Sequence, residues 1–157
     1  MKKIIKTFLI ILFFNLVIAF SIAAEKSEKL LNPGWEFKGF FGKFDRGSLQ
    51  RGYHVYTEVC SSCHSLKYLN YRNLSEPGGP EFTEDQVKAI ASQFEVTDGP
   101  NNDGDMFTRP ARPSDNFVSP YENDNAAKAL NGGAYPPDMS VLVKARKGGA
   151  DYVYSLL

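Results

Sequence analysis

Residues 58–66, EVCSSCHSL, decide how the rest of this chain is interpreted. The stretch holds both cysteines of the 157-residue chain, Cys60 and Cys63, and His64 follows the second one directly. Cys-x-x-Cys-His is the attachment motif of c-type haem. Each thiol can add to one of two neighbouring vinyl groups, and the next imidazole can then bind the iron. We therefore predict one covalent haem c per chain, held by Cys60 and Cys63, with His64 as an axial iron ligand.

Three other kinds of site use the same residue types. A thioredoxin-like redox pair belongs beside a βαβ pattern, and the sequence shows none. A structural zinc site needs four ligands, and His54 is the only other nitrogen ligand in the chain. A plain disulfide is possible but gives His64 no role. Since His54 lies off the apolar stripe of its predicted helix, we expect it to be a solvated or packing residue.

The first 24 residues are typical of a secretory signal peptide. A basic start is followed by an apolar run from Phe8 to Ile22 and then by small residues, with a plausible cleavage site after Ala23 or Ala24. An uncleaved membrane anchor is the alternative, although the run is short for a span of about 20 residues. We expect residues 25–157 to form one exported domain, in an environment where free thiols tend to oxidise.

Charge excludes one class of function. The chain has 18 basic and 18 acidic residues, and the leader would remove three lysines. The remaining domain would be mildly acidic, without the basic patch of a nucleic-acid binder. An exported acidic domain suits basic partners better.

Apolar spacing predicts a mainly α-helical domain with long ordered loops, and no strand pattern is convincing. One helix is expected over residues 48–59, after a cap at Asp45 or Ser48, with Gly52 inside it where another helix could approach closely. A capping box of Thr83 and Gln86 should start the next helix. Further helices are expected after three caps, namely Asn123, Asp138 (helix 139–147) and Asp151.

Beyond the motif, the sequence resembles a known family. Gly52-x-x-x-Tyr56-x-x-x-Cys60 is similar to the first helix of class I cytochromes c. The resemblance sharpens to the cytochrome c1 family along three stretches, FGKFDRGSLQRGYHVYTEVCSSCHSLKYLNYRNL, DGPNNDGDMFTRPARPSDNF and NGGAYPPDMSVLVKARKGGADYVYSLL. It implies a class I cytochrome c-like fold in which a C-terminal helix crosses at Gly52.

The resemblance also implies roles for individual residues. Arg146 would reach a haem propionate, although by itself it would be taken for a surface cation at a helix end. The family's sixth iron ligand is a methionine that lies after the segment ending here, so neither Met106 nor Met139 is assigned to iron. The other haem-binding residues implied, besides the attachment motif, are Asn131, Ala134, Pro136, Pro137, Tyr152 and Leu156.

The implied function is electron transfer. The family supplies the haem subunit of the quinol–cytochrome c oxidoreductase, which is not catalytic alone and works beside cytochrome b. It takes electrons from the Rieske iron–sulfur subunit and passes them to a soluble cytochrome c. Its haem domain would lie on the periplasmic side of a bacterial inner membrane, and a C-terminal anchor would be missing from this chain. The acidic stretch 98–105 either steers a basic acceptor or is a solvated turn.

Two other function classes stay open. One is a free periplasmic cytochrome c or the haem domain of another oxidoreductase. The other is an exported module without haem, held by a Cys60–Cys63 disulfide.

Overall fold

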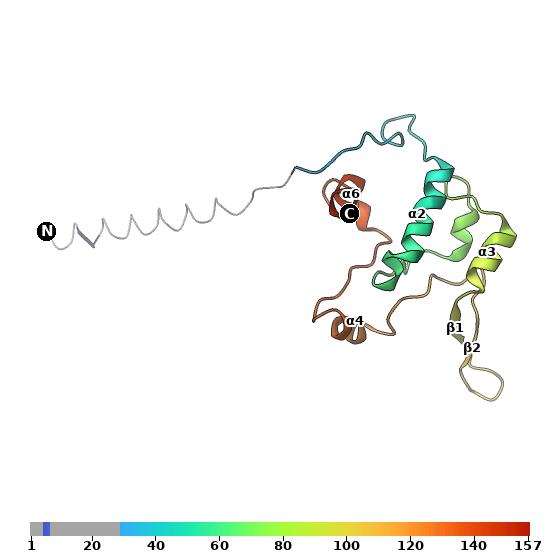
Figure 1. Ribbon diagram of the computed structural model, residues 1–157. Coiled ribbons are helices and arrows are strands. Elements are labelled where there is room, and N and C mark those ends of the chain that lie inside the picture. The colour runs from blue at the N-terminus through green and yellow to red at the C-terminus, as the bar shows by residue number, and fades with distance from the viewer. Residues whose placement is uncertain (1–4, 7–28) are drawn as a thin grey trace. The chain divides into compact units, whose positions relative to one another are not determined.

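The computed structural model describes residues 5–6 and 29–157. Figure 1 draws the remaining residues as a grey trace. The signal peptide predicted over residues 1–24 and its cleavage site lie almost entirely outside the described residues, so both stay predictions. Among the residues that are described, no helix is both long enough and apolar enough to cross a membrane. The features below all belong to the body formed by residues 31–157.

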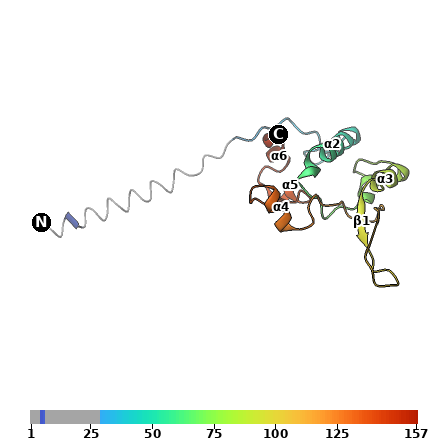
Figure 2. The same ribbon diagram turned by 60° about the horizontal axis from the view of Figure 1, so that its bottom comes forward.

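This body is mainly helical, as the sequence predicts, but it also contains a small sheet. The helices are α2 (Arg46–Glu58), α3 (Glu84–Ala91), α4 (Asp124–Leu130), α5 (Leu142–Ala145) and α6 (Ala150–Leu156), with 3-10 turns η1 (Cys60–Ser62) and η2 (Tyr71–Ser75). Strands β1 (Glu95–Asp98) and β2 (Phe107–Pro110) pair antiparallel. The hairpin projects from the end of α3 in Figures 1 and 2. The sequence shows no convincing strand pattern, so this hairpin was not predicted.

Three of the predicted helix starts are confirmed by their capping bonds. The Asp45 carboxylate accepts a 2.7 Å hydrogen bond from the Ser48 amide and begins α2. Thr83 and Gln86 form the reciprocal capping box of α3. The Asn123 side chain accepts from two amides in the first turn of α4.

The other two predicted caps were wrong. The helix expected over residues 139–147 covers only Leu142–Ala145, and no side chain caps it. Asp138 instead turns its carboxylate toward Ser65 and Lys67. Asp151 lies inside the first turn of α6, where its carboxylate binds the Trp35 indole N–H at 2.6 Å and the Lys38 ammonium at 2.7 Å. Both carboxylates were engaged by distant segments, which a local capping pattern does not reveal.

The core lies between η2, α3 and the base of the hairpin. Its buried members are Tyr71, Leu74, Val87, Ala91, Ala111 and Phe117. The Tyr71 ring stacks on Phe117, with ring centroids 4.6 Å apart. Tyr53 and Tyr56 on α2 pack against this cluster, which fixes the direction of α2. The C-terminal end of α2 leads directly into Cys60.

Candidate haem site

The Cys-x-x-Cys-His stretch forms one tight turn at the end of α2. After Glu58 the chain enters η1, where the backbone N–H groups of Cys63 and His64 both donate to the Cys60 carbonyl, at 3.1 and 2.8 Å. Both cysteines are half-buried and carry free thiols. The two thiols and the imidazole are therefore presented together by a single short loop.

His64 is oriented by a residue far along the chain. Its ring Nδ1 lies 2.8 Å from the carbonyl oxygen of Pro137. A carbonyl can only accept, so Nδ1 must carry the proton, and Nε2 keeps its lone pair free for a metal. The Tyr56 hydroxyl donates to the His64 carbonyl at 3.1 Å and holds the backbone of the same residue.

An apolar cavity of about 210 Å³ lies beside this imidazole. Six of the ten residues predicted from the sequence border it, from the attachment turn, α6 and the stretch between: Cys60, His64, Pro137, Arg146, Tyr152 and Leu156. The Arg146 guanidinium lies 5.8 Å from the centre of the Tyr152 ring. It therefore places a cation beside a wall that is otherwise mostly apolar.

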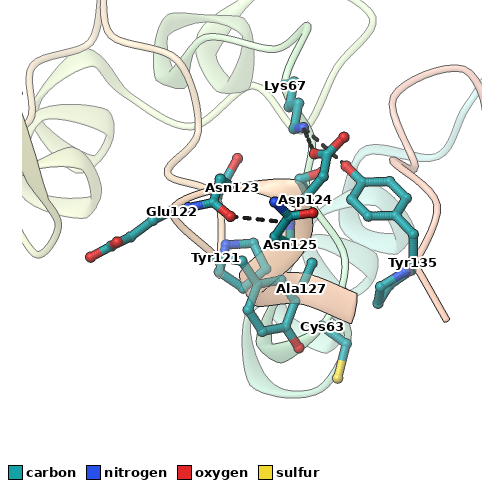
Figure 3. A pocket seen from close by; sticks show the side chains of 13 residues that line it. Cys63, Lys67, Tyr121, Glu122, Asn123, Asp124, Asn125, Ala127 and Tyr135 are labelled. Carbon is teal, nitrogen blue, oxygen red and sulfur yellow. Dashed lines mark hydrogen bonds and ion pairs between the residues drawn. The ribbon is translucent and has the colours of Figure 1, made fainter. Parts of the chain in front are cut away.

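Cys63 and Pro136 border a second, more polar cavity of about 460 Å³. Figure 3 shows the Lys67 ammonium between the Tyr135 hydroxyl, 3.0 Å away, and the Asp124 carboxylate, 4.0 Å away. The thiol of Cys63 lies at the other end of this view. Cys60 thus borders the apolar cavity and Cys63 borders the more polar one.

Asn131 and Ala134 border neither of these cavities. The Asn131 side-chain amide donates to the Tyr121 hydroxyl at 2.9 Å and to the Ala127 carbonyl, and the backbone carbonyl of Asn131 accepts from the Ala134 amide. These two residues therefore shape the turn that carries the chain from α4 to Pro136 and Pro137.

Sequence reasoning missed four residues of the apolar wall, namely Met139, Leu142, Val153 and Leu157. Met139 was interpreted as a core residue, yet it faces the cavity. The spacing of Met139, Leu142 and Arg146 by three and four positions is a helical face, and that signal could have placed all three side chains on one wall. Met106 is 60% exposed on the hairpin and is not part of either cavity.

The other readings of the cysteine pair find little support. In the part of the chain that the structure describes, no three His, Cys, Asp or Glu side chains are grouped to hold a metal ion, as a zinc site would require. The cysteines are not bonded to each other, and the described strands form a hairpin rather than a βαβ unit. The His54 side chain is 75% exposed beside Glu58, which confirms it as a solvated helix residue.

Comparisons with known proteins identify the family of this chain. A model of the Cytochrome C1 family matches residues 35–157. "Cytochrome b/c1" of Bradyrhizobium diazoefficiens is 55% identical over 130 residues, which are 83% of this chain and 19% of that protein. "Cytochrome c1" of Rhodospirillum rubrum is 50% identical, over 91% of this chain and 53% of the relative. "Cytochrome c1-1, heme protein, mitochondrial" of Solanum tuberosum is 47% identical, over 89% of this chain and 43% of the relative.

The chain therefore spans about half the length of these relatives, or less. Over that length the identity is high and extends well beyond the attachment motif. On the matched residues 35–157, this chain belongs to the Cytochrome C1 family.

Proposed function

We propose that this chain binds a covalent haem c and serves as the electron-transfer subunit of a cytochrome bc1 complex. One observation carries the proposal: two free thiols adjoin an imidazole whose Nδ1 is bonded to the Pro137 carbonyl. This arrangement leaves Nε2 available to iron. The printed names of the relatives, which include "Cytochrome b/c1" and "heme protein", support the same interpretation.

The residues present fit such a group. Cys60 and Cys63 would form the two thioether bonds, and His64 would bind the iron through Nε2. Bound haem supplies one-electron chemistry through ferrous and ferric iron. Around it, Pro137, Tyr152 and Leu156 would exclude water, and low polarity of that kind is one of the ways a protein adjusts a reduction potential.

Arg146 would be the cation for a buried propionate, since a guanidinium donates to a carboxylate through two N–H groups. Its position on the cavity beside the Tyr152 ring supports this role. Asn131, Ala134 and Pro136 would place the following Pro137 against the haem. Their bonded turn after α4 supports a scaffolding role.

The wider setting is part of the same proposal. Residues 25–157 would form a class I cytochrome c-like haem domain, exported by residues 1–24 to the periplasmic side of a bacterial inner membrane. Electrons would arrive from the Rieske iron–sulfur subunit, beside cytochrome b, and leave to a soluble cytochrome c.

The hairpin tip would steer a basic acceptor. Asp103 and Asp105 are exposed there, whereas the Asp98 carboxylate is paired with Arg109. Only the first two therefore offer an unpaired negative charge, and complementary charge mainly raises association rates.

Mass spectrometry tests the proposal. The whole chain is expressed for export in a host that matures c-type cytochromes, and the peptide containing CSSCH should carry one added haem. Its visible absorption should survive acid-acetone extraction. The double variant Cys60→Ser, Cys63→Ser should lose the covalent haem.

A matched pair of histidine variants assigns the axial ligand. His64→Gln should change the visible spectrum of the attached haem, because an iron ligand is lost, while His54→Gln should leave it unchanged. An unmodified CSSCH peptide from a host with working maturation would refute the proposal.

A further inference from the structure

We propose that Asp138 is the positioning residue for His64: its carboxylate holds the Pro137 carbonyl against the imidazole and thereby lowers the reduction potential of the iron. This inference rests on the proposed haem function. Asp138 borders neither cavity and would not touch the haem site itself. Its effect would pass through Pro137 and His64.

The carboxylate joins two segments that are far apart in sequence. Its Oδ2 accepts from the Ser65 hydroxyl and from the Lys67 amide, both at 2.8 Å. Its Oδ1 accepts from the Ser140 amide at 2.9 Å. Ser65 directly follows His64, and Pro137 directly precedes Asp138. The carboxylate therefore fastens the two chains immediately beside the contact between His64 and Pro137.

The Pro136–Pro137 pair makes this fastening necessary. Proline has no backbone N–H, so neither residue can donate a hydrogen bond that would fix its own position. The nearest backbone bonds lie on either side, from Ala134 to Asn131 and from Met139 to the Ser65 carbonyl at 2.9 Å. Asp138 thus supplies three of the bonds that determine where the Pro137 carbonyl lies.

The hydrogen bond between Ser65 and Asp138 is also favoured by the burial of Ser65. Ser65 is 5% exposed and is the one buried polar residue found in the described part of the chain, so its hydroxyl needs a partner inside the protein. Burial by itself raises the pKa of Asp138, but hydrogen bonds from Lys67, Ser140 and Ser65 outweigh that effect and leave the pKa below its ordinary value. The carboxylate is therefore ionised at neutral pH and can accept all three bonds.

The link to the iron is the Nδ1–H bond of His64. A strong acceptor at Nδ1 makes the imidazole a more basic ligand, and a more basic ligand favours ferric over ferrous iron. When the Pro137 carbonyl is free to move, this bond weakens, and ferrous iron becomes more stable relative to ferric iron. Loss of Asp138 should consequently raise the midpoint potential.

Asp138→Asn tests the role in the haem-loaded chain. In either orientation of the amide, its NH2 group would face a backbone N–H, that of Lys67 or that of Ser140, donor against donor. We expect the ferric-to-ferrous ratio at a fixed potential to fall about tenfold, which corresponds to about 59 mV for one electron. In ¹⁵N NMR of the reduced protein, the His64 Nδ1–H should exchange faster with water. Asp138→Glu keeps the carboxylate and should restore part of both properties.

Asp115→Asn is the matched control, because the Asp115 carboxylate also accepts three hydrogen bonds, from Arg109 and the Arg112 amide. It borders neither cavity. This variant should lose stability without changing the potential or the Nδ1–H exchange. If Asp138→Asn behaves in the same way, Asp138 is merely structural and the inference fails.

The test also separates this inference from the proposed function. If the wild-type chain carries no haem, the proposed function fails. The Nδ1–H exchange of His64, compared between wild type and variants without haem, still decides whether Asp138 holds the Pro137 carbonyl. If Asp138→Asn does not fold, Asp138→Glu is compared with wild type by the same two measurements.

Discussion

At the scale of single residues, Arg109 shows how much of this fold depends on one side chain. From β2 its guanidinium donates to Asp98 on β1 and forms a two-pronged bond with Asp115, at 2.7 and 3.1 Å. The Arg109 and Asp115 side chains are only 16% and 19% exposed. Asp115 also lies two positions before the buried Phe117. The pair therefore ties the hairpin to the core.

We expect Asp115→Asn to lower the free energy of unfolding at pH 7 by about 1–2 kcal/mol, since it removes a partly exposed charged acceptor. The Arg109 guanidinium lowers the pKa of Asp115 to about 2. A carboxyl whose pKa is lowered in the folded state stabilises the protein fully at pH values above its ordinary, unfolded-state pKa. That stabilisation is lost as the pH falls toward the folded-state pKa. In urea titrations the difference from wild type should be full above pH 5 and shrink between pH 4 and 2. A constant difference over that interval would show that the charge is irrelevant.

The candidate attachment residues could be proposed from the sequence alone, but the long-range contacts of nearby side chains could not. Cys60, Cys63 and His64 are recognisable because their chemistry needs a fixed local spacing. Asp138 and Asp151 looked like helix caps, since an aspartate before an apolar helical pattern usually is one. Their partners lie 71–73 and 113–116 positions away. Pairing over such distances leaves no trace in local pattern.

At the scale of elements, α2 has one packed face and one open face. Tyr53 and Tyr56 pack on the core, whereas Val55 and Val59, the residue directly after the helix, are 50% and 62% exposed. A Cβ atom built on Gly52 would meet no atom within 4 Å. The close helix crossing expected at this glycine is therefore not made by any residue that the structure describes.

Gly52→Ala should stabilise this chain by about 0.5–1 kcal/mol, because alanine lowers the entropy cost of a helix and the new methyl group has free space. Gly99→Ala is the contrasting variant. Gly99 has a φ of 123°, and a Cβ there would lie 3.0 Å from the Asp105 carbonyl oxygen, so alanine should destabilise the hairpin. Thermal unfolding of both variants checks this. A loss of stability in Gly52→Ala would mean that another segment packs at this point.

The hairpin was missed for a physical reason that applies to short strands in general. Four residues per strand are too few to show a clear alternation, and the glycine- and asparagine-rich stretch 98–105 is typical of a loop. Side-chain contacts hold the hairpin. The Asn101 side chain accepts from the amides of Asp103 and Asp105, and Arg109 binds Asp98 across the two strands. Helices α2 and α3 were predictable because their caps are local.

At the scale of the whole body, its first residues are fastened to its last helix. The Leu31 amide donates to the Ser155 hydroxyl at 2.9 Å, and the Trp35 and Lys38 side chains bind Asp151. The Trp35 ring also meets Tyr154 edge-on, at 5.5 Å. Part of the aromatic stretch 32–44 (NPGWEFKGFFGKF) therefore packs against α6. Phe40 and Phe41, by contrast, are 96% and 87% exposed.

Trp35→Ala should loosen α6, and through it the wall that Tyr152 and Leu156 give to the apolar cavity. Hydrogen exchange measured by mass spectrometry should be faster in residues 150–156, while residues 84–91 of α3 should be unaffected. Trp35→Phe keeps an aromatic ring but loses the bond to Asp151, so it should show an intermediate rate. Unchanged exchange in α6 would show that this helix is held by other contacts.

His64 and Pro137 are 73 positions apart in the sequence, and this distance also separates two events during the synthesis of the chain. In the proposed export, CSSCH would leave the ribosome and cross the membrane well before Pro137, whose carbonyl orients His64. Thioether formation could then be complete while the polypeptide is still emerging. The electronic character of the imidazole would be set only after the later segment has folded back, so the proposed haem could be attached before its final reduction potential is established.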